Sequence, residues 1–353
     1  IKENNSMIYY PDSLSKNVEK YRIKAKDIII TTVGSRPELK ESAVGRGIFI
    51  DTDNNGFLNQ NLLILRTTPD NVSKFIASQI NTNRYIDYIK SIQRGNANQA
   101  NITVNDLLDY TIVVTSTEEQ QKIADFLTSV DRKISQLTEK HRLLTQYKKG
   151  VMQQIFSQQL CFKDEDGSAF GEWENHTIGD IMQESRIKGS GGDTAKKLTV
   201  KIWGKGVIPK KEGIIGSENT QYYKRKSGQF IYGKLDFLNC AFAIIPPELD
   251  GYESTLDLPS LDVSSSVNKF FILAVVTHKW FYKKYGEIAD GSRKAKRINV
   301  GVFQAMPIKL PVKKEQDKIM SFLQAIDAKI DATSQQLEQT KLFKKGLLQQ
   351  MFV

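Results

Sequence analysis

The stretch EQQKIADFLTSVDRKISQLTEKHRLLTQYKKGVMQQIF, residues 119–156, occurs twice in this chain of 353 residues. Its second copy, EQDKIMSFLQAIDAKIDATSQQLEQTKLFKKGLLQQMF, occupies residues 315–352. The two copies align without a gap at an offset of 196, and 15 of the 38 aligned positions are identical. Self-similarity over such a length predicts two copies of one structural unit.

Apolar residues recur in both copies at alternating spacings of four and three, and neither copy contains proline. A period of 3.5 residues over about five heptads is typical of a coiled-coil helix, so each copy is predicted to be one long helix. Because two copies of a unit in one chain tend toward a pseudo-two-fold relation, we expect the helices to pair and to run antiparallel. The seam residues of the two copies are Ile123, Leu127, Val130, Ile134, Leu137, Leu144 and Lys148, and Ile319, Leu323, Ile326, Ile330, Leu337 and Lys344.

The tripeptide Lys148-Lys149-Gly150 recurs as Lys344-Lys345-Gly346. A glycine inside a helix costs about 1 kcal/mol relative to alanine. Either the glycine ends each helix as a C-terminal cap, or it lets a partner's helix approach closely. The lysines are then either a solvated face or part of the same contact. The repetition of all three residues favours contact with a partner protein.

Upstream of the helices the same offset continues through less similar sequence, where Phe75-Ile76 faces Phe271-Ile272, and Ile102-x-Val104 faces Ile298-x-Val300. Each helix therefore follows a globular region of similar layout but different sequence. The chain is predicted to be α+β, with two mixed domains separated by two long helices that form an antiparallel coiled coil. The predicted segments are residues 1–115 for the first domain, 116–160 for the first helix, 161–172 for a linker, 173–311 for the second domain and 312–353 for the second helix.

The two predicted domains begin differently. The second opens near Trp173, 50 residues before Tyr223-Lys224, whereas the matching pair in the first domain, Tyr21-Arg22, has 20 residues before it. The first domain is therefore expected to lack about 30 residues of its natural start. Candidate strands in the two domains are Asp27–Thr32, Leu62–Arg66, Phe230–Tyr232, Cys240–Ile245 and Met306–Leu310.

Charge and composition limit the choice of partner. The chain has 50 Lys+Arg against 40 Asp+Glu, a net of +10, and residues 173–311 hold 21 basic and 14 acidic residues. A basic excess suits a polyanion such as nucleic acid, although it also favours solubility. The longest apolar run, residues 270–276, is far shorter than the roughly 20 residues of a membrane span. The two cysteines are too few for a disulfide framework or a cysteine zinc site, which indicates a reducing, cytoplasmic setting.

No motif predicts an active site. Gly228-x4-Gly233-Lys234 resembles a phosphate-binding loop, but Leu235 stands where Ser or Thr should hold magnesium. The three histidines have no metal-like spacing. Asp12, Glu38 and Lys40 loosely fit a nuclease metal site, a pattern permissive enough to arise by chance.

Pro307-Ile-Lys-Leu-Pro311, followed by Glu315-Gln316-x-x-Ile319-x-x-Phe322-Leu323-x-x-x-Asp327-x-x-Ile330, resembles the specificity (S) subunits of Type I restriction–modification systems. The first-half counterpart from Ile112 to Ile134 is similar to them too, as is the entry Gly171-Glu-Trp173 with Thr177-Ile-Gly-Asp-Ile181. The resemblance covers essentially the whole chain. The first half departs from it in lacking the two prolines, because Thr111-Ile-Val-Val-Thr115 stands in their place.

The resemblance implies a non-catalytic protein with two target-recognition domains, each binding one half of an interrupted double-stranded DNA target. It implies that the helices set the distance between the domains and bind two methyltransferase subunits, which a motor-nuclease (restriction) subunit joins. The chain itself would hold no cofactor, because the methyl donor and ATP bind to those partner subunits. Half-sites on one face of DNA lie roughly 34–36 Å apart, a spacing that helix length can set. A metal-dependent DNA nuclease and a coiled-coil structural adaptor without sequence recognition remain open alternatives.

Contacts with DNA are expected from cations and amides in loops of both domains, with phosphate contacts supplying affinity and base contacts supplying specificity. The loop 293–297 of the second domain is matched by the loop 94–99 of the first, where amides replace cations. Merely solvated charge is the alternative for each cluster. The candidates are Arg36, Lys40, Arg46, Arg94, Asn96, Asn98 and Gln99 in the first domain, and Lys210, Lys211, Tyr223, Lys224, Arg225, Lys226, Arg293, Lys294, Lys296 and Arg297 in the second.

Overall fold

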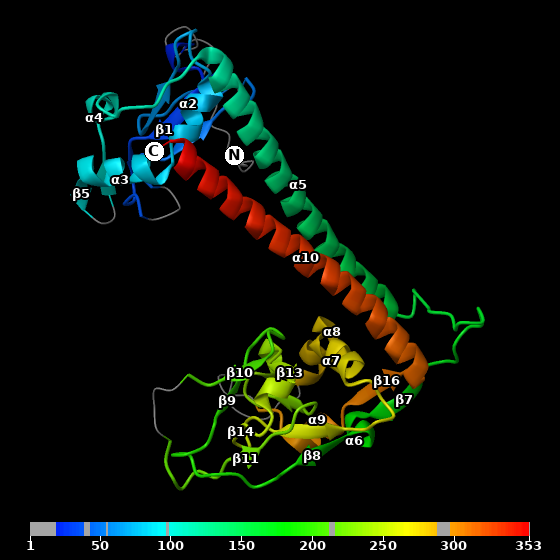
Figure 1. Cartoon of the computed structure of the whole chain (residues 1–353). Coiled ribbons are helices and arrows are strands. Elements are labelled where there is room, and N and C mark those ends of the chain that lie inside the picture. Colours follow the sequence, from blue (N-terminus) through cyan, green and yellow to red (C-terminus); the bar gives the residue numbers. More distant parts are fainter. Residues whose placement is uncertain are drawn as a thin grey trace. The chain divides into compact units, whose positions relative to one another are not determined.

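The computed structural model of the chain describes residues 19–38, 43–53, 56–96, 99–211, 216–287 and 297–352. The chain folds into two compact units, and each takes in part of both long helices (Figure 1). Unit 1 comprises residues 1–143 and 331–353, and unit 2 comprises residues 144–330. The predicted domain boundaries set the helices apart from the domains, and those boundaries stay a prediction.

Two long helices, α5 (Thr117–Phe156) and α10 (Lys313–Met351), contain the two copies of the repeat. Each helix continues past its glycine, Gly150 or Gly346, so the alternative that the glycine ends the helix is wrong. A Cβ built on either glycine would meet no atom within 4 Å. Both glycines therefore lie inside a helix with open space beside them.

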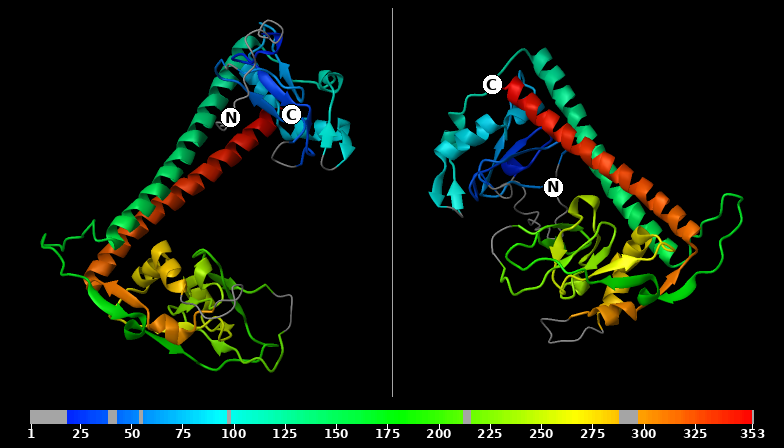
Figure 2. Two further views of the ribbon diagram at one scale, coloured as in Figure 1. Left: turned by 180° about the vertical axis from the view of Figure 1, so that it is seen from behind. Right: turned by 60° about the horizontal axis from the view of Figure 1, so that its bottom comes forward.

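Within each unit α5 and α10 pack side by side and run in opposite directions (Figure 2). In unit 1 the beginning of α5, with Leu127, shares a core with Phe352, which follows the end of α10. In unit 2 the end of α5, with Val151 and Ile155, shares a core with Leu323 near the beginning of α10. The expected antiparallel pairing of the two copies is confirmed.

Two ion pairs join the helices, and they are copies of each other. In unit 2 Lys148 Nζ lies 2.5 Å from Asp327 Oδ1, and in unit 1 Lys344 Nζ lies 2.5 Å from Asp131 Oδ1. Both lysines and both aspartates are related by the offset of 196. Each lysine side chain is 29% exposed, so it crosses the rim of the seam rather than its apolar interior.

The apolar seam positions differ in burial. Those that are buried are Leu127, Val130, Leu137, Ile319, Leu323 and Ile326. Those that are half-buried are Ile123, Ile134, Leu144, Ile330 and Leu337.

The described residues of unit 1 form two small antiparallel sheets and three short helices besides their parts of the long ones. Its elements are the 3-10 turn η2 (Glu19–Tyr21), β1 (Ile28–Thr31), β2 (Val33–Gly34), β3 (Gly47–Phe49), β4 (Leu62–Leu65), α2 (Ser73–Gln79), α3 (Asn83–Ile92), β5 (Arg94–Asn96), β6 (Gln99–Asn101) and α4 (Val104–Leu108). The central sheet has the order β3-β1-β4, and a second sheet has the order β2-β6-β5. Ile28 and Ile30 alternate inward from β1 and share a core with Phe75 of α2 and Tyr85 of α3.

Unit 2 has a larger set of strands. Its elements are β7 (Glu174–Thr177), α6 (Ile178–Ile181), β8 (Met182–Ser185), β9 (Leu198–Val200), β10 (Val207–Pro209), β11 (Tyr223–Lys224), β12 (Phe230–Tyr232), η3 (Phe237–Asn239), β13 (Phe242–Ile244), η4 (Pro247–Leu249), β14 (Glu253–Ser254), β15 (Ser260–Val263), α7 (Lys269–Thr277), α8 (Lys279–Gly286), α9 (Val300–Gln304) and β16 (Pro307–Leu310). The central sheet has the order β13-β12-β15-β8. Phe230 and Tyr232 of β12 share a core with α7 and α8, whereas Ile231 packs on the other face with β9 and β10. The central strand is therefore covered on both faces.

The two units share one scaffold. β12 pairs antiparallel with β13 and β15, as β1 pairs with β3 and β4. The helices α7, α8 and α9 follow these strands as α2, α3 and α4 do, and α9 lies at the offset of 196 from α4. Phe75-Ile76 and Phe271-Ile272, which align in the sequence, are all buried. Each of the five predicted strand ranges contains one strand.

A buried glutamine fixes the first turn of each long helix. In unit 1 the Val72 N–H donates to Gln120 Oε1 (2.9 Å), and Gln120 Nε2 donates to the carbonyl of Thr115 (2.7 Å). Val72 precedes α2, and Thr115 precedes α5. The amide therefore ties the starts of two helices together, where backbone groups have no partner within their own helix.

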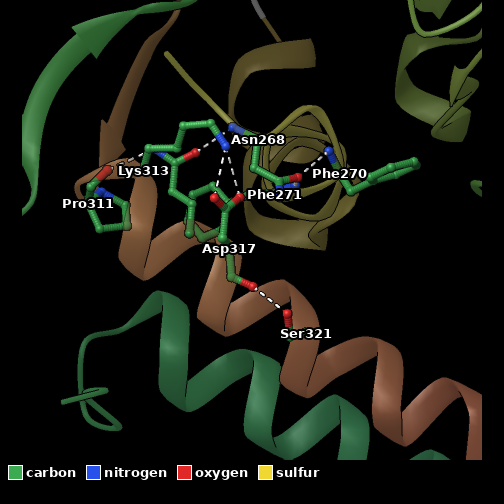
Figure 3. A network of polar contacts seen from close by, with 8 residues as sticks. Asn268, Phe270, Phe271, Pro311, Lys313, Asp317 and Ser321 are labelled. Atoms are coloured by element: carbon green, nitrogen blue, oxygen red, sulfur yellow. Dashed lines mark hydrogen bonds and ion pairs between the residues drawn. The ribbon is translucent and has the colours of Figure 1, made fainter. Parts of the chain in front are cut away.

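Unit 2 repeats this junction at the offset of 196 (Figure 3). The Asn268 N–H donates to Gln316 Oε1 (2.9 Å), and Gln316 Nε2 donates to the carbonyl of Pro311 (2.8 Å). Here Asn268 Nδ2 also donates to Asp317 Oδ1 (2.7 Å), and Asp317 pairs with Lys313 (2.8 Å). The glutamine that is identical in both copies of the repeat thus has one structural role, performed twice.

Candidate nucleic-acid interface

Several predicted DNA contacts of unit 2 lie at strand ends. Lys210 and Lys211 follow β10 directly, and both are exposed. Lys224 on β11 and Lys226 just after it are exposed as well, whereas Tyr223 is half-buried. The four lysine side chains are accessible to a phosphate or a base edge without any change in the fold.

Arg225 departs from this pattern, because alternation along the chain turns it inward while its two neighbours face solvent. The residue is fully buried, and its guanidinium donates to Ser254 Oγ (2.7 Å), Ser260 Oγ (3.0 Å) and the Ser185 carbonyl (2.9 Å). Burial lowers the pKa of Arg225 to about 10, so it stays charged at neutral pH. The prediction of a DNA contact is corrected here: Arg225 ties the chain after β11 to β14, β15 and β8.

More cations border these strands than the sequence predicted. Lys188 forms an isolated bridge with Tyr223, and Lys197 forms one with Glu253 of β14. These bridges bring the segments before β9 beside β11 and β14. The further exposed cations of this region are Arg186, Lys188, Lys196, Lys201 and Lys205. They are spread along residues 186–205, and no run longer than the pair Lys196-Lys197 marked them.

An exposed tryptophan, Trp203, lies in the turn between β9 and β10. Its side chain is 53% exposed, and its backbone has a left-handed φ of 64°. The Trp203 N–H donates to the carbonyl of Asn239 (2.7 Å), which fixes the turn to the unit. Lys201 and Lys205, two residues before and after it in the sequence, are exposed as well. Because aromatic rings beside cations can stack on bases, this turn is a candidate contact that the sequence pattern did not reveal.

In unit 1 the predicted contact Arg94 is already paired within the chain. Its guanidinium makes two hydrogen bonds with the Asp106 carboxylate, of 2.7 and 2.9 Å. Asp106 also accepts from the Thr103 N–H (2.7 Å) and so caps α4. The bonds from Arg94, followed by those from Thr103, hold the pKa of Asp106 well below its usual range. Arg94 remains 59% exposed, so it can meet a ligand while its charge is compensated.

The other predicted contacts of unit 1 differ in exposure. Arg36 and Gln99 are exposed. Arg46 is half-buried, and its Nη2 donates to the carbonyl of Pro37 (3.1 Å), so it holds its own loop. Asn96 belongs to β5 by its backbone. Two further candidates lie outside the described residues, namely Lys40 and Asn98.

The basic loop that was predicted before α9 is described only at its end. Arg297 is exposed, and its Nη1 lies 3.4 Å from Asp257 Oδ1. The other three cations lie outside the described residues, namely Arg293, Lys294 and Lys296. The match between this loop and residues 94–99 stays a prediction.

Two of the exposed aromatic side chains on the long helices occupy matching positions of the repeat, outside the seam pattern. Tyr147 is 53% exposed and Phe343 is 54% exposed, and they are related by the offset of 196. Each directly precedes the lysine of an interhelical ion pair, and each has an exposed lysine two positions later, Lys149 or Lys345. Exposed aromatic groups are frequent at protein–protein contacts. The match of tyrosine to phenylalanine in the repeat was the signal that could have identified them.

The alternative of a nuclease finds no support in the described residues. Among them, no group of three or more His, Cys, Asp or Glu side chains is placed to hold a metal ion. Of the three residues considered, Glu38 is exposed, and Asp12 and Lys40 lie outside the described residues. No helix in the described part of the chain has the length and apolar character needed to cross a membrane.

The family model for the Type I restriction modification DNA specificity domain matches residues 2–145 and 255–342. Among solved structures, the S subunit of a Type-I restriction-modification system from M. genitalium is similar, with a TM-score of 0.56 and 17% identity over 95% of this chain and 85% of that chain. A second, from work on complex assembly and conformational transition of the type I R-M system, has a TM-score of 0.53 and 16% identity over 93% of this chain and 82% of that chain. No curated protein sequence matches the chain. Because the family model covers more than half of the sequence, the chain belongs to the Type I restriction–modification DNA specificity family.

Proposed function

We propose that the chain recognises a bipartite double-stranded DNA target, with one half-site bound by each unit, and that its long helices bind two methyltransferase subunits. The family supplies the coarser role, since its members are non-catalytic DNA-recognition components of Type I restriction–modification systems. The observation that carries the proposal is a scaffold that occurs twice with different residues on its surface loops.

The two units differ where DNA contacts are expected. In the sequence, residues 94–99 are rich in amides, whereas residues 293–297 are rich in cations. Amides suit adenine edges, whereas arginine and lysine suit guanine edges and phosphates. Dissimilar loops on one scaffold support two different half-sites rather than a palindrome.

The repeated helix surface supports binding of two copies of one partner. Tyr147 and Lys149 in unit 2 have the counterparts Phe343 and Lys345 in unit 1, and all four side chains are exposed. A surface that occurs twice fits two molecules of the same protein, one for each copy. We assign these molecules to the methyltransferase subunits, through which the restriction subunit joins. The methyl donor and ATP then bind to the partners.

Selection from a random duplex library tests the bipartite target. The chain is assembled with its methyltransferase subunits, and the bound DNA is sequenced. We expect two half-sites separated by a spacer of fixed length. Exchange of residues 173–311 for those of another family member should change one half-site, and the unchanged half-site is the internal control. Selection of no bipartite consensus by an assembled complex would favour the structural adaptor.

Native mass spectrometry tests the docking surfaces. Tyr147→Asp and Phe343→Asp, introduced singly, should each remove one methyltransferase copy, because each places a charge in one of two equivalent contacts. Lys140→Asp changes an exposed residue of α5, the helix that carries Tyr147, and is the control. Full occupancy in both single variants and in their combination would contradict the assignment.

A further inference from the structure

In each unit a short basic segment directly precedes the central strand. Residues 21–30 (YRIKAKDIII) and 223–232 (YKRKSGQFIY) align at an offset of 202 and lead into β1 and β12. Lys24 of the first segment is matched by Lys226 of the second, and both side chains are exposed. This basic segment, residues 21–27 in unit 1 and 223–229 in unit 2, is called the strand entry below. It is present twice, although the two units differ widely in sequence.

The turn inside this entry is also the same in both units. The Lys24 N–H donates to Asp27 Oδ2 (2.8 Å), and the Lys226 N–H donates to Gln229 Oε1 (2.9 Å). Each turn contains one residue with a left-handed backbone, namely Lys26 (φ 69°) and Gly228 (φ 85°). The lysine side chains take no part in these bonds, so their substitution leaves the turn intact.

The entry is linked to the same neighbouring strand in both units, by different chemistry. Asp27 Oδ1 accepts from Arg66 Nε (2.8 Å), directly after β4. Gln229 Nε2 donates to Asp262 Oδ1 (2.8 Å), on β15. Arg66 and Asp262 are related by the offset of 196. The side-chain hydrogen bond between the entry and the neighbouring strand thus lies at the same place in both units, although the residues that form it differ.

A cleft lies beside each entry, of ≈800 Å³ in unit 1 and ≈530 Å³ in unit 2. Corresponding segments line both clefts: the strand entry, the loop that follows β4 or β15, the start of α2 or α7, and the first turn of the long helix. In both clefts the lining cations outnumber the lining carboxylates by two. The lining lysines that form no ion pair with any described residue are Lys24 and Lys26 in unit 1, and Lys226 and Lys269 in unit 2.

We propose that each cleft binds the sugar–phosphate backbone of DNA beside the half-site of its own unit. The inference rests on the proposed function and adds to it a site for non-specific anchoring. The phosphate backbone is chemically the same at both half-sites, whereas the bases differ. A basic cleft that occurs in both units, although their loops differ, suits the phosphate backbone, which is the same at every DNA sequence.

An acidic segment of a partner protein is the competing occupant of a basic cleft. Continuity with the predicted DNA contacts favours DNA, because Lys226 lies two residues from Lys224 and three from Tyr223 of β11. In unit 2 the cleft therefore continues from the exposed Lys224 of β11, and by equivalence the cleft of unit 1 has the same role.

The salt dependence of DNA binding tests the proposal in the assembled complex. Lys24→Ala with Lys26→Ala, and separately Lys226→Ala with Lys269→Ala, should each lower the slope of log affinity against log salt by about 1 per lysine. Between about 50 and 200 mM salt, each lost contact makes the fall in affinity about threefold smaller. Target and non-target duplexes should weaken alike, and the selected consensus should not change. Lys90→Ala and Lys283→Ala, at exposed positions of α3 and α8, are the matched controls.

Four outcomes separate the possibilities. An unchanged slope and affinity in the variants, with a bipartite consensus still selected, overturns the cleft assignment and leaves the proposed function standing. Loss of methyltransferase binding by the variants, at unchanged DNA affinity of whatever complex remains, overturns it in favour of a protein occupant. Lys24→Arg and Lys226→Arg should keep the slope, because the charge is retained, and a reduced slope in these variants counts against a phosphate contact. A parent complex that selects no bipartite target contradicts the proposed function itself.

Discussion

Units 1 and 2 share a scaffold, yet the apolar segment that follows the short helix α4 or α9 is exposed in unit 1 and buried, as strand β16, in unit 2. In unit 2, Ile308 and Leu310 of β16 are each 3% exposed. Their counterparts in unit 1, Ile112 and Val114, are 36% and 57% exposed. The described residues of unit 1 contain no strand paired with residues 111–114.

A segment from elsewhere in the chain makes the difference. In unit 2, β7 pairs with β16 over four residues, and the Ile178 N–H of α6 donates to the Met306 carbonyl (3.0 Å). In unit 1 a cavity of ≈370 Å³ opens beside Ile112, with Tyr85 and Tyr110 among its lining residues. Equivalent positions on one scaffold thus have unequal burial, because burial depends on what covers them.

A carboxylate introduced at these equivalent positions should give the largest difference in stability between the two units. Ile308→Asp places an unpaired carboxylate in the core of unit 2 and should lower its free energy of unfolding by more than about 3 kcal/mol. Ile112→Asp, at the equivalent exposed position, should change unit 1 by less than about 1 kcal/mol. All three tryptophans lie in unit 2, so tryptophan fluorescence during urea denaturation reports that unit, and far-ultraviolet circular dichroism reports both. Equal losses in the two variants would contradict the role of β7.

Replacement of the junction glutamine should lower stability by a similar amount in both units. Gln120→Ala and Gln316→Ala each leave one partly buried N–H without its acceptor, that of Val72 or of Asn268, and each should cost about 1–3 kcal/mol. Hydrogen exchange at those two amides is the direct measurement. Loss of protection at one amide only would show that the junctions are not equivalent. Gln121→Ala, an exposed neighbour on α5, is the control.

Two carboxylates should give opposite pH dependences. Burial raises the pKa of Glu315 above its usual 4.5, so this group destabilises unit 2 as the pH rises through the raised pKa. The advantage of Glu315→Gln over the parent should therefore grow with pH. The lowered pKa of Asp106 means that its contribution to unit 1 is present above pH 3.8 and is lost as the pH falls through the lowered pKa. The deficit of Asp106→Asn should therefore shrink on acidification.

Urea denaturation of both variants and the parent over a pH series measures these differences. The tryptophan signal isolates the effect of Glu315→Gln, since Glu315 lies in unit 2. A difference between the Glu315→Gln variant and the parent that does not vary with pH would show that Glu315 titrates normally in the folded chain.

The interhelical ion pairs should show the smallest effect. Double-mutant cycles on Lys148 with Asp327, and on Lys344 with Asp131, should each give a coupling energy of about 0.2–1 kcal/mol, because all four side chains are partly exposed. The two couplings should agree with each other and should fall as salt is added. A coupling energy in one pair and none in the other would show that the two ion pairs are not equivalent.

Periodicity and repetition were sufficient to predict the organisation of this protein. The 3.5-residue period of residues 119–156 and 315–352 predicted two long helices, and the duplication predicted that they pair antiparallel. The alignment of Phe75-Ile76 with Phe271-Ile272 predicted that the globular parts share a layout. These features depend on local pattern and on comparison within the chain, so no knowledge of distant contacts was needed.

The roles of individual polar side chains required the fold. Arg225 stands in the run YYKRK and looked like an exposed cation, but serines of β14 and β15 enclose its guanidinium. Lys148 was expected either on a solvated face or in a contact with a partner protein, but its carboxylate partner is Asp327, 179 residues away in the same chain. Ile308 and Ile112 occupy equivalent positions, and among the described residues only Ile308 lies on a strand that is paired with another, β7. Side-chain burial and pairing depend on segments that are remote in sequence, and a local pattern carries no information about which segments those are.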